Sequence, residues 1–101
     1  MQEKYKASHD SLTGLLNRDQ FYEDVHDMVN KYHDTTFYLI CSNIKDFKFI
    51  NEIFGMEKGN QVLIKQAKLM ASNPSERTIC ARLRMTALRC VCQEKSLMKK
   101  E

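Results

Sequence analysis

The sequence predicts a small α/β domain, an α+β sandwich in which helices cover a sheet. The 101-residue chain is 43% hydrophobic and 29% charged, which fits one folded domain and excludes disorder along the whole chain. Apolar residues recur at helical spacing in several segments, and two other short segments are rich in β-branched and aromatic residues. The predicted order is helix, strand, helix, helix, strand.

The first helix is predicted over residues 18–32 from the spacing of its apolar side chains. Residues 1–9 are polar and resemble the end of a linker, and Gly14 gives backbone freedom to a compact turn before the helix. Asn17 has the identity of an N-cap, with Gln20 as its capping-box partner. The apolar residues of the predicted face are Phe21, Val25, Met28, Val29 and Tyr32.

The remaining helices and strands are predicted from the sequence between residues 35 and 83. Residues 35–42 are aromatic and β-branched without clean alternation, which suits a strand buried on both faces. Asp46 can cap a short helix that ends at Gly55, and a longer amphipathic helix is expected over residues 57–72. Residues 78–83 predict the second strand.

A helical crossover joins the two predicted strands. We therefore expect them to pair directly and in parallel, within a right-handed βαβ unit. Side chains from both strands and from the helices between them should form the core. The residues expected to be buried are Phe37, Leu39, Cys41, Ile50, Phe54, Leu63, Ala67, Met70, Ile79 and Ala81.

The segment after Leu83 shows no convincing period. Residues 85–92 fit either a strand or a helix, and the sequence does not decide between them. From Arg77 to Glu101 the chain has seven Lys or Arg and two Asp or Glu, with few aromatic side chains among them. We therefore expect a solvated basic end with no nucleic-acid partner. We also expect it to have no face to bury and to be the least ordered part of the chain.

Neither a membrane segment nor a cysteine framework is evident. The longest uncharged apolar run, Phe37–Cys41, is too short to span a bilayer, and no leader opens the chain, so we expect a cytoplasmic protein without a membrane partner. Disulfides are rare in that compartment, and Cys41 and Cys80 lie in apolar runs. Cys90 and Cys92 have no second ligand pair, so a metal site is not favoured.

Two motifs resemble a known family. Residues 10–21 read D-S-L-T-G-L-L-N-R-D-Q-F, and residues 43–63 read N-I-K-D-F-K-F-I-N-E-I-F-G-M-E-K-G-N-Q-V-L. Together they resemble the first half of a GGDEF domain, the diguanylate cyclase family, with patterns D-x-L-T-G-L-x-N-R-x-x-F and D-I-D-x-F-K-x-I-N-D-x-x-G-H-x-x-G-D-x-x-L. The resemblance covers about residues 8–83. It implies an incomplete GGDEF, nucleotidyl-cyclase-like sheet covered by helices.

The resemblance implies a chemistry, and two departures from the pattern bear on it. Members of the family condense two GTP molecules to cyclic di-GMP, with Mg²⁺ on the phosphates and two domains face to face. The family's first metal aspartate falls on Asn43, whose neutral amide oxygen is a weaker ligand for a hard cation. The second aspartate of that motif falls on Lys45. We therefore expect Asn43 to be a weak, vestigial metal position and no Mg²⁺ to be bound.

The resemblance also implies vestigial nucleotide-binding positions. Asn51 matches the family's guanine-contacting asparagine, and Asn60 stands where an aspartate accepts from the guanine edge. Phe47 and Lys48 match residues that line the phosphate region. The spacing of Phe47 also fits a core residue, and Lys48 fits an exposed lysine equally well.

The family's G-G-[DE]-E-F turn is expected within a few residues of Arg82, where the chain reads R-L-R-M-T-A-L instead. That segment has no glycine pair and no carboxylate, so no catalytic residue is assigned. We divide the chain into a linker-like segment 1–9, a partial GGDEF domain 10–83 truncated before the turn, and an atypical basic tail 84–101. Out-of-frame translation is one hypothesis for the tail, because a shifted frame starting in the Arg84 codon can encode a degenerate GGDEF-like turn.

The sequence thus predicts a degenerate, truncated GGDEF-domain protein of cyclic di-GMP signalling that is inactive as this chain. The alternative is a GTP-binding or dimerisation module that regulates an intact partner, with a second copy or another GGDEF-containing protein as that partner. An active cyclase is least favoured, because its metal ligands would have to come from elsewhere. We expect the isolated chain to be marginally stable, since an open sheet edge lacks its cover.

Overall fold

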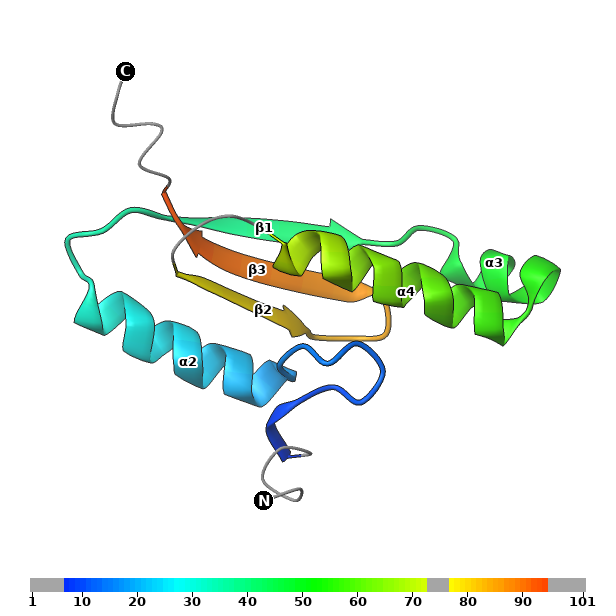
Figure 1. The fold of residues 1–101 in the computed structure, drawn as a ribbon, viewed down its shortest axis with the longest axis horizontal. Helices are drawn as coiled ribbons and strands as arrows, with labels where there is room; N and C mark the ends of the chain where they lie inside the picture. The colour runs from blue at the N-terminus through cyan, green and yellow to red at the C-terminus, as the bar shows by residue number, and fades with distance from the viewer. Residues whose placement is uncertain (1–6, 73–76, 95–101) are drawn as a thin grey trace.

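A computed structural model describes residues 7–72 and 77–94 of the chain (Figure 1). Three strands form one sheet, and a helix packs on each of its faces. The α+β class predicted from the sequence is confirmed. The elements are α2 (Arg18–Lys31), β1 (Phe37–Asn43), α3 (Phe47–Phe54), α4 (Met56–Ala71), β2 (Thr78–Arg82) and β3 (Ala87–Gln93).

The first helix begins as its capping residue predicts. The Asn17 side-chain oxygen accepts a hydrogen bond from the backbone N–H of Gln20 at 3.0 Å. The Gln20 side chain does not return to Asn17 but donates to Asp24 at 2.7 Å, and the Asn17 N–H donates to the Ser8 carbonyl at 2.8 Å. The reciprocal capping box is therefore wrong, because this N–H already has a backbone partner.

The short helix α3 lies where it was predicted, but its start differs in detail. Asp46 occupies the N-cap position with a left-handed φ of 55°, and its side chain makes no capping hydrogen bond. Gly55 ends the helix with a φ of 89° and also precedes α4. A side chain at that φ would be strained, so glycine joins the two helices at little conformational cost.

The sheet order is β1-β3-β2, which corrects the predicted pairing. Both β1 and β2 pair with β3 in antiparallel fashion, so β1 and β2 run in the same direction but do not pair directly. The short connection over residues 83–86 lets β3 fold back on β2 as a hairpin, which closes a much smaller loop than the helical crossover does. The hairpin therefore fills the place beside β1 that a parallel β2 would have taken.

The segment after Leu83 also differs from its expectation. In residues 87–93 it forms the central strand, and four of its side chains are buried, in contrast to the predicted lack of an apolar face. Leu88 and Cys90 are fully buried toward α4, whereas Val91 is buried toward α2. Burial on both faces removes the simple alternation by which a half-exposed strand is recognised. The prediction for residues 95–101 lies outside the described residues.

The core consists of two layers on opposite faces of the sheet. The layer under α4 contains Ala67, Met70, Leu88, Cys90 and Cys92. The layer under α2 contains Phe21, Met28, Ala81 and Val91. Each face of β3 therefore carries apolar side chains beneath a helix, and this burial is the main favourable contribution to folding.

The predicted core is confirmed only in part. Leu63, Ala67, Met70 and Ala81 are buried, and Phe37, Ile50 and Ile79 are half-buried. Leu39 and Phe54 are 62% and 64% exposed, and Cys41 is also exposed, so these three assignments are wrong. The sheet order explains Leu39 and Cys41, because β1 lies at the edge and α2 packs beneath β2 instead (Figure 1). Phe54 is the last residue of α3, which packs mainly against α4 and not against the sheet.

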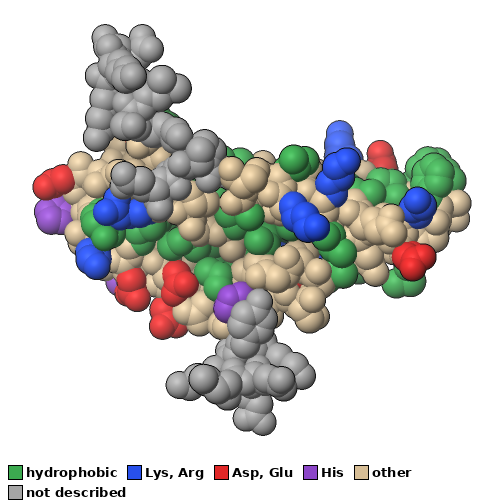
Figure 2. All heavy atoms as spheres, viewed as in Figure 1, with side chains coloured by type: hydrophobic (Ala, Val, Ile, Leu, Met, Phe, Trp, Pro, Cys, Tyr) green, Lys and Arg blue, Asp and Glu red, His purple; other side chains and the backbone are tan. Residues whose placement is uncertain are grey.

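Exposed apolar side chains occur on β1, on α3 and at Met56, the first residue of α4. Figure 2 shows hydrophobic side chains at the α3 end of the molecule. The exposed members are Tyr38, Leu39, Ile40, Phe49, Ile53, Phe54 and Met56, which we call the β1–α3 apolar surface. Within residues 7–72 and 77–94, no helix has the length and apolarity needed to cross a bilayer.

The burial of β3 predicts a large effect of truncating Leu88. Leu88→Ala should lower the free energy of unfolding by about 2–5 kcal/mol, because it leaves a cavity in the layer under α4. Met85→Ala, in the exposed turn only three positions away, should change it by no more than about 0.5 kcal/mol. Urea unfolding of both variants measures the difference. Equal effects would show that the segment after Leu83 is not part of the core.

Candidate functional site

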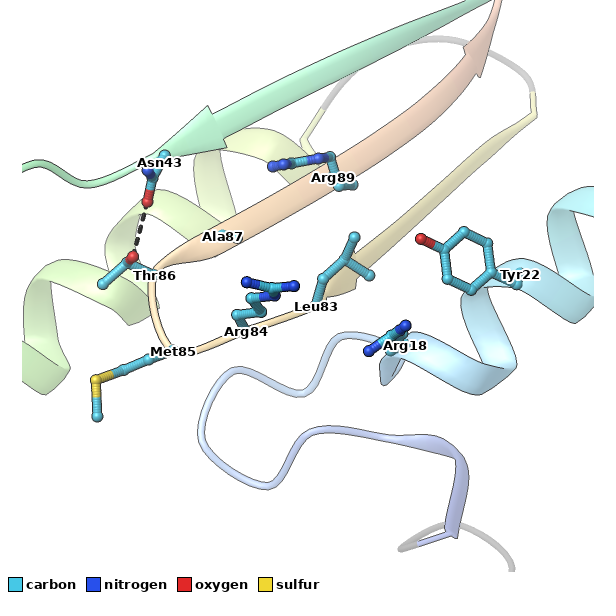
Figure 3. A pocket seen from close by; sticks show the side chains of 9 residues that line it. All are labelled: Arg18, Tyr22, Asn43, Leu83, Arg84, Met85, Thr86, Ala87 and Arg89. Carbon is cyan, nitrogen blue, oxygen red and sulfur yellow. Dashed lines mark hydrogen bonds between the residues drawn. The ribbon is translucent and has the colours of Figure 1, made fainter.

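A hollow of about 500 Å³ opens between the N-terminal end of α2, the end of β1 and the β2–β3 turn (Figure 3). Arg18 and Tyr22 come from α2, Asn43 ends β1, and Arg89 projects from β3. The turn supplies the rest of the lining: Leu83, Arg84, Met85, Thr86 and Ala87. We call this the arginine hollow, because three of its side chains are arginines and none is acidic.

The β2–β3 turn is held by backbone hydrogen bonds and by one side chain. The Leu83 N–H donates to the Ala87 carbonyl at 2.8 Å. Arg82 donates from Nε and Nη2 to the Met85 carbonyl at 3.1 and 2.9 Å. A planar guanidinium with two donors on one oxygen fixes the turn more tightly than a flexible single donor could. The turn therefore holds the rim of the hollow in place.

The same guanidinium also reaches the loop before α2. Arg82 Nη1 donates to both carboxylate oxygens of Asp10, at 3.1 and 3.2 Å. The Thr13 N–H and hydroxyl each donate to Asp10 at 2.8 Å. The two charged side chains are only 15% and 20% exposed, so solvent screens this ion pair less than a surface pair.

Two opposing effects act on the pKa of the Asp10 carboxyl. Burial, the largest single effect, raises the pKa, whereas the hydrogen bonds from Thr13 and the nearby positive charge of Arg82 lower it. The combined effect of these donors prevails, and the pKa is lower than its ordinary value. Asp10 therefore stays ionised and holds the N-terminal loop against the turn.

The predicted metal position lies at the rim of the arginine hollow. The Thr86 hydroxyl donates to the Asn43 side-chain oxygen at 2.7 Å, so this oxygen already has a proton donor (Figure 3). All charged side chains of the lining are arginines, which repel a cation. Among the described residues no cluster of three His, Cys, Asp or Glu could hold a metal ion. The donor set does not fit Mg²⁺, which prefers carboxylate oxygens.

The arginines suit an anionic ligand instead. Arg89 Nη1 donates to the Leu88 carbonyl at 2.9 Å and to the Ser42 carbonyl at 3.4 Å, which orients its guanidinium across the strands. Arg18 and Arg84 are exposed and flank the hollow from α2 and from the turn. Guanidinium groups bind phosphate and carboxylate oxygens through paired donors.

Sequence reasoning did not find this site. Arg18 was used only as part of a motif, and Arg84 and Arg89 were counted only as charges of a solvated end. The excess of basic residues after Arg77 was the available signal. It could not be interpreted without the sheet order, which brings residues 18, 43 and 84–89 together.

The predicted nucleotide-binding residues lie elsewhere, on α3 and α4. Phe47 is buried, Asn51 and Asn60 are half-buried, and Lys48 is exposed. None of the four belongs to the lining of the arginine hollow. The structure therefore joins Asn43 to the hollow but leaves these four residues outside it.

Asn51 packs against the start of α4. A Cβ added at Gly59 would lie 1.9 Å from the Asn51 Oδ1 atom and 3.1 Å from the Phe47 ring, so glycine permits the close approach of α3 and α4. The Asn51 Oδ1 atom is buried and has no hydrogen-bond partner among the described residues. An unpaired buried amide oxygen is unfavourable by roughly 1–3 kcal/mol, which makes Asn51 an uncommon choice for packing alone.

Comparisons with known proteins agree on one family. The sequence model described as "Diguanylate cyclase, GGDEF domain" matches residues 7–99. Diguanylate cyclase DgcM of Escherichia coli K12 is 36% identical over 71 residues, which cover 68% of this chain and 17% of that protein. A diguanylate cyclase of Vibrio cholerae is 37% identical over 79 residues, which cover 76% of this chain and 25% of that protein.

A solved structure shows the same fold. The coiled-coil and GGDEF domain of DgcB from Caulobacter crescentus, in complex with c-di-GMP, superposes with a TM-score of 0.82 at 25% identity. The match covers 97% of this chain and 53% of that one. The chain thus spans a quarter or less of these curated relatives and about half of this solved structure.

The Asp10–Arg82 pair predicts a dependence of stability on pH. The folded state lowers the pKa of Asp10, so the ionised carboxylate stabilises the fold above the unfolded-state pKa of about 3.9. This contribution is lost as the pH falls through the lower folded-state pKa. Asp10→Asn should therefore reduce the free energy of unfolding by about 1–2 kcal/mol at pH 7 and by less at pH 3.

Urea titrations of the wild-type chain and Asp10→Asn at both pH values measure this difference. Other carboxylates titrate in both proteins, so their effect cancels in the comparison. A difference that stays constant or grows as the pH falls would contradict the stabilising role of the Asp10 charge.

Proposed function

The chain belongs to the diguanylate cyclase GGDEF family, and from this premise we propose that it has no cyclase activity of its own. The observation that carries the proposal is the arginine hollow, whose lining has three arginines and no carboxylate. The hollow is formed by the end of β1 and by the turn after Arg82, the positions where the family pattern has its metal aspartate and its signature turn. The site keeps the family's backbone position but has the opposite charge.

With this reversed charge, the site lacks the groups that the cyclase reaction requires. Transfer of a phosphoryl group depends on neutralising the charge of the phosphates and on activating the attacking hydroxyl. In the family a divalent cation supplies the first, and positioned carboxylates contribute to both. Asn43 shares its oxygen with the Thr86 hydroxyl, and Ala87 has no functional group. Arginines can bind phosphates, but a permanently protonated guanidinium cannot accept a proton from a ribose hydroxyl.

Incubation of the full chain with GTP and Mg²⁺ should therefore yield no cyclic di-GMP above a protein-free blank. Loss of a single positioned group in such a site commonly lowers the rate 10²–10³-fold, and here the metal and the base are both lost. Chromatography with mass detection measures the product, and an active diguanylate cyclase in parallel serves as the positive control. Product formed by the purified chain at any rate above the blank would falsify the proposal.

A second function, the binding of nucleotide phosphates without metal, is supported by the same hollow. Three guanidinium groups can supply the positive charge that Mg²⁺ supplies in the family. The hollow, at about 500 Å³, has room for a triphosphate and part of a nucleoside. On this proposal the chain holds GTP as a ligand and does not convert it.

Such a GTP-binding module would act in signalling by pairing with a second copy or with another GGDEF-containing protein. The β1–α3 apolar surface supports this, because one edge of β1 has no strand partner among residues 7–72 and 77–94 and its neighbouring side chains are exposed. The proposal that the chain regulates an intact partner depends on this association. Sedimentation of the full chain from micromolar to millimolar concentration gives its oligomeric state.

The proposal that GTP binds without metal predicts how its Kd responds to EDTA and to the loss of an arginine. The Kd for GTP should change less than about twofold when EDTA replaces Mg²⁺, because arginines carry the phosphate contacts. Arg84→Ala should weaken binding roughly tenfold, since one charge-assisted hydrogen bond contributes on the order of 1.5 kcal/mol. Isothermal titration calorimetry measures both effects.

Lys65→Ala is the matched control for this titration. Lys65 is an exposed cation on α4 outside the lining of the hollow, so its loss changes the net charge equally but removes no proposed contact. Binding that requires Mg²⁺, or equal weakening in the two variants, would contradict the assignment of the phosphates to the arginine hollow.

A further inference from the structure

Two cysteines face each other across the β2–β3 hairpin. Cys80 and Cys90 are register partners, and their sulfur atoms lie 3.1 Å apart. Both thiols point to the α4 side of the sheet, where they pack with Ala67 and Met70. Two reduced thiols at this distance need to approach by only about 1 Å to reach the length of a disulfide bond.

The backbone at this position favours such a bond. The Cys80 carbonyl accepts from the Leu16 N–H at 3.2 Å, so its polar groups point away from β3. Cys80 and Cys90 therefore form a non-hydrogen-bonded pair of the antiparallel ladder. Such pairs have a Cα–Cα distance of about 4.5 Å, which lies within the range of disulfides. The bond can thus form with little movement of the strands.

The two thiols differ in access and in acidity. Cys90 is fully buried, whereas Cys80 is half-buried and lines a second surface hollow, of about 350 Å³, with Gly14, Leu15 and Ala71. Contact with the Cys90 thiol lowers the pKa of Cys80. The same contact, together with burial, raises the pKa of Cys90. Cys80 is therefore the more accessible and the more acidic of the two thiols, and it should meet a reagent first.

We propose that Cys80 and Cys90 are a redox-active pair that hydrogen peroxide converts to a cross-strand disulfide. The Cys80 thiolate attacks the peroxide, an S–O bond forms, the O–O bond breaks, and the leaving hydroxide takes a proton to give water. The Cys90 sulfur then attacks the Cys80 sulfenic acid. The S–S bond forms, the S–O bond breaks, and the hydroxide leaves with the Cys90 proton as a second water. The two thiols lose two electrons, and the peroxide gains them.

The neighbouring thiols do not share this geometry. Cys92 lies on the same face of β3 but is the register partner of Thr78, and Cys41 is an exposed residue of β1 whose partner is Arg89. The sequence did not favour a disulfide, because disulfides are rare in the expected cytoplasmic compartment. The opposition of Cys80 and Cys90 exists only in the hairpin register. A bond between them would tie β2 to β3 directly behind the turn that forms the arginine hollow. This inference is independent of the proposed function.

Peroxide treatment of the reduced full chain tests the inference. The intact mass should fall by about 2 Da, the loss of two hydrogens. Trypsin cleaves after Arg77, Arg82, Arg89 and Lys95, so the digest should contain residues 78–82 joined to residues 90–95. Fragmentation of that species should locate the bond at Cys90 rather than Cys92. The melting temperature should rise by about 5 °C or more, and dithiothreitol should reverse every change.

Three variants and one denaturing condition make the test specific. Cys41→Ser and Cys92→Ser should keep the cross-link, whereas Cys80→Ser should lose it. The same oxidation in urea should lose the preference for Cys80 and Cys90, because the hairpin is then absent. Overoxidation of Cys80 without a cross-link, or a cross-link to Cys41 or Cys92 in the native chain, would overturn the proposal. The digest of the wild-type chain decides this even if a variant fails to fold.

Discussion

The hydrogen bonding of β3 on both of its edges is the constraint on which the rest of the structure depends. β1 is an edge strand, and β2 has only short bridging contacts on its other side, near Leu16. Because β3 lies between them, its register places Thr86 beside Asn43, Cys90 opposite Cys80, and Leu88 beneath α4. The core, the arginine hollow and the cysteine pair thus all follow from one strand that the chain adds after the hairpin turn.

The electrostatics of the site follow from the same turn. Arg82 neutralises Asp10 and also holds the Met85 carbonyl, so one guanidinium fixes both the N-terminal loop and the rim of the hollow. The three arginines of the hollow itself have no acidic neighbour in its lining. A site of this charge attracts phosphates and repels metal ions. The chain therefore keeps the fold of its family, and the arginine hollow has a lining without carboxylates.

Much of the local structure could be predicted from the sequence, because its signals are local. Asn17 and Gly55 mark helix ends, and α2, α3, α4, β1 and β2 lie within a few residues of their predicted bounds. β3 was not predicted, because a strand buried on both faces with Arg89 in its middle has no clear period. The wrong pairing and the wrong burial of Leu39 follow from that omission. The arginine hollow could not be predicted either, since its residues meet only in the β1-β3-β2 order.

Amide hydrogen exchange tests the central position of β3 most directly. Exchange requires a hydrogen bond to open, and a strand paired on both edges opens only when the sheet itself unfolds. The account predicts that amides in residues 87–93 exchange as slowly as any in the chain and more slowly than those of the edge strand at residues 37–43. Faster exchange in residues 87–93 than in residues 37–43 would contradict the account, because the core and the arginine hollow both require β3 between β1 and β2.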